Sequence, residues 1–175
     1  MTTTRCCALA AALTIATAAS AQSQFWSELK AGAHPVGFRA LYQLDWARSY
    51  DADYPIPGSS PLHKPRPIFL AIWYPAAAPH DVAMVYRDYF RVLTEGSPVP
   101  EFAQRLRKFT RDMACEYMLG KTFDKLTDGE RVAWDGLLAT PVFATRDVPA
   151  AAGKFPVVIY HPGLGGTFED NSVAC

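Results

Sequence analysis

The sequence predicts an α/β fold with a mixed sheet, and three observations support that prediction. Residues 34–76 contain an alternation of apolar and polar side chains and a short apolar run, both typical of strands. Residues 84–140 change to the period of an amphipathic helix. Residues 142–175 return to a strand, which runs into a glycine-rich turn and a helix. This order is typical of a sheet that begins antiparallel and becomes parallel.

Two strands are predicted in the first region. One alternating apolar set consists of Phe38, Ala40, Tyr42 and Leu44. The second strand is the apolar run "RPIFLAIWYPA", which Pro75 closes. The stretch between them, "YPIPGSSPLHKPRP", is dense in Pro, Gly and Ser, as loops are. We therefore expect an antiparallel pair joined by a proline-rich loop.

The middle region predicts two helices with ordinary core-packing faces. The first helix, in "EFAQRLRKFTRDMACEYML", follows Pro98 and Pro100, which suit a helix start. Its apolar positions, spaced four, three, four and four apart, are Phe102, Leu106, Phe109, Met113 and Tyr117. The second helix has Thr127 and Glu130 at capping-box spacing, and Pro141 is expected to stop it.

The last region predicts a strand that is buried on both faces, because Phe155–Tyr160 is apolar without alternation. The turn 161–166 should lie at the carboxyl end of this strand. The following "FEDNSVAC" is predicted to form the first turns of a helix that Asp170 or Asn171 caps.

Residues 1–21 have the pattern of a cleavable export signal. Arg5 supplies a positive start, Cys6–Ala18 is a small-residue apolar core, and an A-x-A cleavage site ends at Ala21. The apolar core is shorter than the ~20 residues that span a bilayer, so no stable membrane anchor is expected. We expect a secreted or periplasmic protein that begins at Gln22.

Composition argues against some classes of partner but does not decide whether the cysteines form a disulfide. The chain has 175 residues with 17 basic and 17 acidic side chains, which gives no reason to expect nucleic acid or an anionic membrane as partner. Beyond the leader, Cys115 and Cys175 are compatible with one disulfide in an oxidising compartment. A buried Cys115 within a helix and an exposed Cys175 is the simpler interpretation. The histidines show no metal-ligand spacing, so neither a metal nor another cofactor is expected.

The turn "HPGLGG", residues 161–166, is the candidate functional motif. It lacks the lysine of a phosphate loop and the spacing of a dinucleotide loop. Backbone amides in such a turn are suited to stabilise the oxyanion that forms when an ester or amide carbonyl is attacked. The alternative is a strand-to-helix turn that needs glycine for its geometry alone.

At this point the chain resembles a known family. "RPIFLAIWYPA" and "GKFPVVIYHPGLGGTFEDNSV" resemble the secreted serine esterases of the α/β-hydrolase fold, particularly the branch of platelet-activating-factor acetylhydrolase and dienelactone hydrolase. The resemblance runs from about His34 to the last residue and is weak over the insert 84–140. It implies that residues 22–175 are an incomplete, N-terminal part of a hydrolase sheet: antiparallel first strands, a helical insert, and the first parallel strand with its oxyanion loop.

The resemblance also implies roles for residues of the turn. The backbone N–H of Leu164 would be an oxyanion donor, and Gly163 and Gly165 would give the loop its geometry. His161 would mark the strand end and orient the loop, without acting as the catalytic base. Pro162 departs from the many relatives that have glycine after the histidine, and it removes one N–H. The implied substrate of the intact relative is a small-molecule or lipid ester, with no cofactor.

The remaining parts of a serine-hydrolase triad are not found in the sequence. No serine after the leader has glycine at both minus two and plus two, and no histidine follows His161. We therefore expect the N-terminal part of a longer exported carboxylic-ester hydrolase, inactive by itself. The alternative is a noncatalytic exported binding protein on a hydrolase-like scaffold. A two-chain enzyme is a third possibility, which two exposed sheet edges disfavour.

Overall fold

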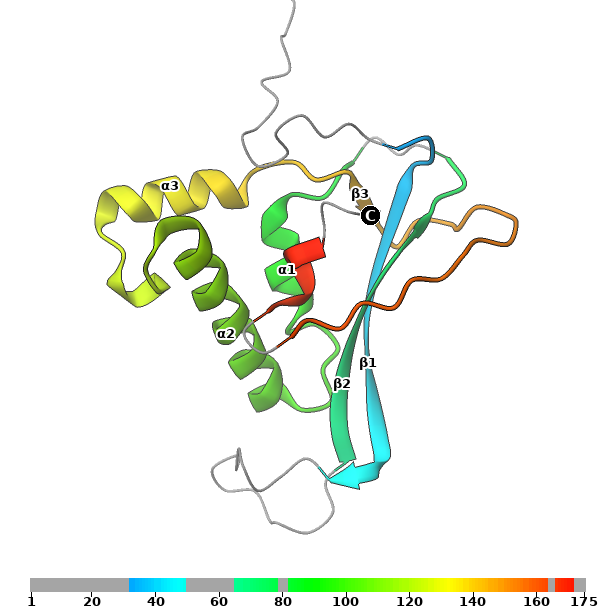
Figure 1. Cartoon of the computed structure of the whole chain (residues 1–175), viewed down its shortest axis with the longest axis horizontal. Coiled ribbons are helices and arrows are strands. Elements are labelled where there is room, and N and C mark those ends of the chain that lie inside the picture. Colours follow the sequence, from blue (N-terminus) through cyan, green and yellow to red (C-terminus); the bar gives the residue numbers. More distant parts are fainter. Residues whose placement is uncertain (1–31, 50–64, 79–81, 164–165, 172–175) are drawn as a thin grey trace, which may run out of the picture.

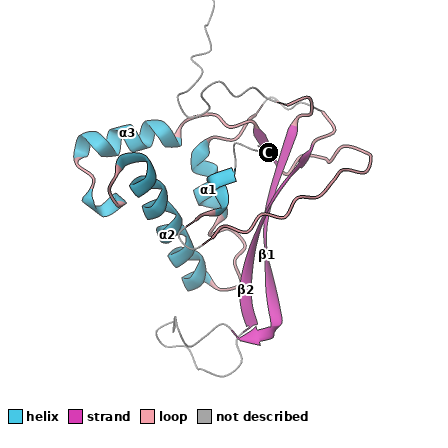
Figure 2. Cartoon of the chain, viewed as in Figure 1, coloured by secondary structure: helices cyan, strands magenta, loops and turns pink. Residues whose placement is uncertain are grey.

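The computed structural model describes residues 32–49, 65–78, 82–163 and 166–171. The predicted signal peptide lies outside these residues. Figures 1 and 2 show a long two-stranded hairpin with the helices on one side of it. The elements in chain order are β1 (Val36–Ser49), β2 (Pro65–Pro75), α1 (Tyr86–Val92), α2 (Pro100–Leu119), the 3₁₀ helix η1 (Phe123–Lys125), α3 (Asp128–Leu138), β3 (Ala144–Arg146) and the 3₁₀ helix η2 (Phe168–Asn171).

The predicted antiparallel pair is confirmed. In the register of β1 and β2, Gly37 lies opposite Tyr74 and Phe38 lies opposite Trp73. Because side chains alternate along a strand, Phe38 and Trp73 share one face of the hairpin. That face is turned towards α1, where the Phe38 ring lies 5.1 Å from the ring of Tyr89.

A third, short strand makes the sheet mixed. β3 pairs with the start of β1 in parallel, from Val36 opposite Ala144 to Phe38 opposite Arg146, so the strand order is β2-β1-β3. The exposed side chains of Arg39 and Asp147 form an ion pair, 3.3 Å apart, beside this pairing. A small mixed α/β sheet with an antiparallel start is thus present, as expected, but its parallel strand is Ala144–Arg146 and not the predicted Phe155–Tyr160.

The prediction of a buried strand at Phe155–Tyr160 is wrong. No strand is assigned there, and Val157, Val158 and Ile159 have exposed fractions of 85%, 89% and 90%. A strand of this kind needs neighbouring strands to accept its backbone hydrogen bonds and cover its side chains. The described sheet consists of β2, β1 and β3, and none of these strands pairs with the segment.

The helix boundaries follow the predicted signals. α2 begins at Pro100, and Gly120 ends it with a φ of +70°, a conformation that favours glycine. α3 begins after Thr127, whose backbone N–H donates to the carboxylate of Glu130 at 2.8 Å. The predicted capping box is therefore confirmed, and α3 ends before Pro141 as expected.

The buried side of α2 differs from the predicted apolar stripe. Its buried residues are Ala103, Thr110, Ala114 and Cys115. In contrast, Phe109 is 46% exposed and Tyr117 is 93% exposed. These small side chains allow α1 and η1 to pack closely against α2. The side of α2 that contacts α1 and η1 is therefore the buried side, although the opposite side carries larger apolar residues.

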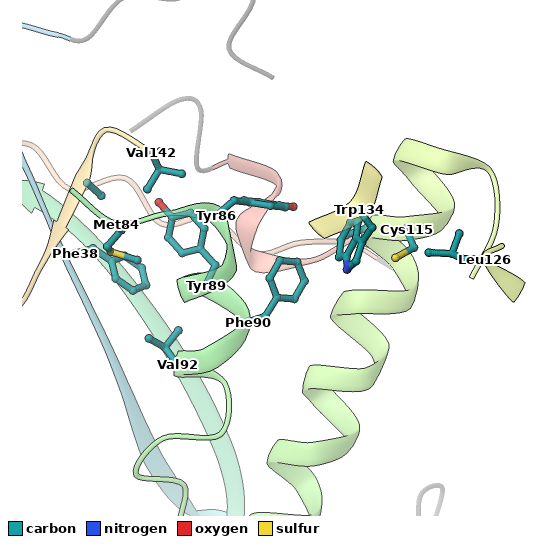
Figure 3. Packing of buried hydrophobic residues seen from close by; sticks show 12 residues of the cluster. Phe38, Met84, Tyr86, Tyr89, Phe90, Val92, Cys115, Leu126, Trp134 and Val142 are labelled. Atoms are coloured by element: carbon teal, nitrogen blue, oxygen red, sulfur yellow. The ribbon is translucent and has the colours of Figure 1, made fainter. Parts of the chain in front are cut away.

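One hydrophobic core lies between the hairpin and the helices, as Figure 3 shows. Its labelled members are Phe38, Met84, Tyr86, Tyr89, Phe90, Val92, Cys115, Leu126, Trp134 and Val142. The backbone N–H of Met84 donates to the carbonyl oxygen of Ala144, and that of Val142 donates to the carbonyl oxygen of Met84, both at 2.9 Å. These two hydrogen bonds join the segment before α1 to the segment after α3, so the two ends of the helical insert lie side by side.

Candidate active site

The candidate site is the glycine turn that precedes η2. The backbone N–H of Gly166 donates to the carbonyl oxygen of Gly163 at 3.1 Å, which closes a four-residue turn. Leu164 and Gly165, the implied oxyanion donor and one loop glycine, lie outside the described residues. The structure therefore describes the two ends of the turn.

The described geometry does not by itself require glycine at position 163. A Cβ added to Gly163 would meet no atom within 4 Å, and its φ lies outside the left-handed region. Glycine at such a position leaves room for another molecule to approach the backbone. The alternative interpretation, glycine for turn geometry alone, gains no support at this residue.

The chain after the turn is fixed to the core by an aromatic cluster. The ring of Phe168 lies 5.1 Å from that of Phe69, 6.0 Å from that of Tyr89 and 6.3 Å from that of Trp73. The indole N–H of Trp73 donates to the hydroxyl of Tyr89 at 3.2 Å. Thus aromatic side chains of β2, α1 and η2 meet at Phe168, and these contacts anchor the chain that leaves the turn.

Sequence reasoning missed this anchor. Phe168 belongs to a helix signal in the sequence, and nothing local shows that it contacts Phe69, almost one hundred residues earlier. Thr167 and Glu169, on either side of Phe168, are also buried, with exposed fractions of 5% and 4%. The burial of Glu169, an acidic residue close to the glycine turn, is visible in the structure but not in the sequence.

The chain before the turn is exposed. His161 is exposed and makes no side-chain hydrogen bond within the described part of the chain, and Pro162 is half-buried. The expected role of His161 in orienting the loop stays a prediction. Within the described residues, His161 has no ring contact like those that Phe168 makes on the other side of the turn.

The described residues bring no nucleophile to the turn. The hydroxyl of Ser97 is engaged by the backbone of Val99, at 3.1 and 3.2 Å, in the bend before α2. The other candidate nucleophile is the Cys115 thiol, and burial raises its pKa to about 11, which keeps it protonated. Cys115 is buried within α2 without a disulfide, as predicted, whereas Cys175 lies outside the described residues.

The described residues contain no group of three or more His, Cys, Asp or Glu side chains placed to hold a metal ion. No helix among them combines the length and apolar character needed to cross a membrane.

The site must be interpreted from its own residues. Comparison of the chain with models of protein families, with curated proteins and with solved structures finds no match in any of the three.

Proposed function

We propose that this chain is the N-terminal part of an exported carboxylic-ester hydrolase of the α/β-hydrolase type. In this proposal, the turn 161–166 contributes a backbone amide to the oxyanion hole. The antiparallel β1–β2 hairpin, the helical insert and the apolar segment that ends in the glycine turn follow one another in the order that the resemblance implies. The resemblance of the sequence at "RPIFLAIWYPA" and "HPGLGG" supports the same proposal.

The observation that carries the proposal is the contrast between the two sides of the turn. An oxyanion donor must be held rigidly, because it acts only if it needs no reorganisation during the reaction. Phe168 supplies that rigidity behind the turn, while Gly163 leaves its front open to another molecule. An anchored exit and an open approach are what an oxyanion donor in this turn would need.

The proposed chemistry divides the roles between this chain and further residues. A serine on a G-x-S-x-G elbow, activated by a histidine, would attack the acyl carbonyl of a small-molecule or lipid ester. The Leu164 amide would donate to the oxyanion that forms, and water would later release the acyl group. Because this sequence contains no such elbow, we expect the 175-residue chain alone to leave nitrophenyl acetate unhydrolysed.

The experiment that tests the proposal is to determine the coding sequence beyond the Cys175 codon. The proposal expects an open frame that encodes G-x-S-x-G, then an Asp or Glu, then a His. In the resulting protein, Leu164→Pro removes the proposed donor N–H and should lower kcat by ~10²–10³-fold. The control Leu164→Ala keeps the N–H and should retain most of the activity. A frame without the elbow, or equal activity of the two variants, would contradict the proposal.

A noncatalytic exported binding protein is the second candidate, and one observation favours it. The core packs β1, α1, α2 and α3 together without a contribution from Phe155–Tyr160. A stop codon directly after Cys175 would favour this candidate over the esterase.

A further inference from the structure

Tyr89 of the helical insert contacts the chain that leaves the glycine turn. It lies in α1, its side chain is 1% exposed, and its ring centroid is 6.0 Å from that of Phe168, at an interplanar angle of 82°. Figure 1 shows η2, the red element that begins at Phe168, beside α1. The helical insert therefore reaches the exit of the turn through a buried aromatic side chain.

The hydroxyl of Tyr89 links this contact to β2. It accepts a hydrogen bond from the indole N–H of Trp73 at 3.2 Å, and the two ring centroids are 6.0 Å apart. The ring of Trp73 is in turn 6.3 Å from that of Phe168 and inclined to it by 30°. Because a hydrogen bond is directional, it fixes the relative orientation of the two rings that contact Phe168.

The residues on either side of Phe168 are buried as well, and they connect its ring to the turn. Thr167 and Glu169 have exposed fractions of 5% and 4%. Only Thr167 separates Phe168 from Gly166, whose backbone N–H closes the turn on the carbonyl oxygen of Gly163 at 3.1 Å. Each residue has only two soft backbone torsions, so a buried Thr167 leaves little freedom between the Phe168 ring and the closing bond.

We propose that Tyr89 is a positioning residue for the turn 161–166. Its hydroxyl orients Trp73, and the two rings together fix Phe168 and, through it, the closing bond of the turn. The catalytic meaning of this inference rests on the proposed function, in which the turn donates to an oxyanion and must be held in place before the reaction. Catalytic groups tolerate displacements of only about 0.5 Å, so a small loss of order at Phe168 is sufficient to lower activity.

The test is hydrogen exchange of the 175-residue protein, followed by NMR. Tyr89→Phe keeps the ring and removes the acceptor of the Trp73 indole N–H. We expect the N–H of Gly166 and the indole N–H to exchange about two- to tenfold faster, the effect of one lost hydrogen bond on a local opening equilibrium. The matched control is Tyr74→Phe, which removes a 2.6 Å hydrogen bond to Val148 on the opposite face of β2 and should leave the exchange of Gly166 unchanged.

A double-mutant cycle separates the hydrogen bond from general packing. In a Trp73→Phe background the donor is already absent, so Tyr89→Phe should have little further effect on the exchange of Gly166. Three results would each overturn the proposal: wild-type exchange in Tyr89→Phe, an equal effect of Tyr74→Phe, or an effect of Tyr89→Phe that persists in the Trp73→Phe background.

The activity of the enzyme encoded by an extended reading frame distinguishes this proposal from the proposed function. In that enzyme, Tyr89→Phe should lower kcat about two- to tenfold with KM unchanged, and Tyr74→Phe should change neither. An active esterase in which Tyr89→Phe keeps kcat would overturn the positioning role alone. A frame without the G-x-S-x-G elbow would contradict the proposed function, while the exchange measurements still decide whether Tyr89 holds the turn.

Discussion

Gly37→Ala tests the register of the β1–β2 hairpin at the position where the ring of Tyr74 lies over Gly37. A Cβ built on Gly37 would lie 2.3 Å from one carbon of the Tyr74 ring and 2.5 Å from another, which no real Cβ tolerates. The ring must therefore move. Its hydroxyl donates to the carbonyl oxygen of Val148 at 2.6 Å, so movement also weakens a contact to the segment after β3.

The magnitude follows from three contributions. Overpacking costs about 1–3 kcal/mol, and loss of the Tyr74 hydrogen bond costs about 0.5–1.5 kcal/mol. Alanine restricts the unfolded chain and returns about 0.4–1 kcal/mol. We expect Gly37→Ala to lower the free energy of unfolding by about 0.5–4 kcal/mol, measured by urea denaturation at 25 °C.

The same substitution has the opposite sign in α3. An alanine Cβ at Gly136 would meet nothing within 4 Å, and the residue is exposed within the helix, so Gly136→Ala should raise the free energy of unfolding by about 0.5–1 kcal/mol. In a Tyr74→Ala background, most of the cost of Gly37→Ala should disappear. The reasoning is refuted if Gly37→Ala is neutral or stabilising, or if its cost persists without the Tyr74 ring.

Three further predictions concern the core and the charges. Phe38→Ala should lower the free energy of unfolding by about 3–5 kcal/mol in urea denaturation, because Phe38 is fully buried. Trp46→Ala, at a side chain that is 78% exposed, should change it by no more than about 0.5 kcal/mol. Similar effects of the two substitutions would contradict the burial of Phe38 in the core. The hydrogen bond from Lys121 lowers the pKa of Glu130 from 4.5 to about 2, so its stabilisation is present above pH 4.5 and is lost as the pH falls towards 2. Glu130→Gln should flatten that part of the stability profile, and an unchanged profile would argue against the ion pair. Cys115 should resist alkylation, located by mass spectrometry, until the chain unfolds; rapid labelling of the folded protein would contradict its burial.

Local patterns were sufficient to predict β1, β2, α2 and α3, but they did not reveal α1. The alternation in β1, the proline at the start of α2 and the capping box before α3 each act within a few residues, so the sequence contains them directly. The antiparallel pairing of β1 and β2 follows from their adjacency along the chain.

Long-range contacts could not be predicted in the same way. An apolar run such as Phe155–Tyr160 has the same composition whether or not other strands lie beside it. The exposed Tyr117 belongs to a regular apolar stripe, and only the approach of α1 and η1 decides that the other side of α2 is buried. Of the candidate site, the sequence locates the turn 161–166, but not its anchor through Phe168 to Trp73.

The parallel contact of β3 with β1 has a consequence for the order of folding. β1 meets β2 after the connection 50–64, but it meets β3 only after the whole helical insert, as the separation of 108 residues between Arg39 and Asp147 indicates. Closing so long a loop costs chain entropy before the contact stabilises anything, so such pairings form slowly. During synthesis from the N-terminus, the hairpin is therefore expected to form first, α1 can then cover its Phe38 face, and β3 completes the sheet only after the whole helical insert has emerged.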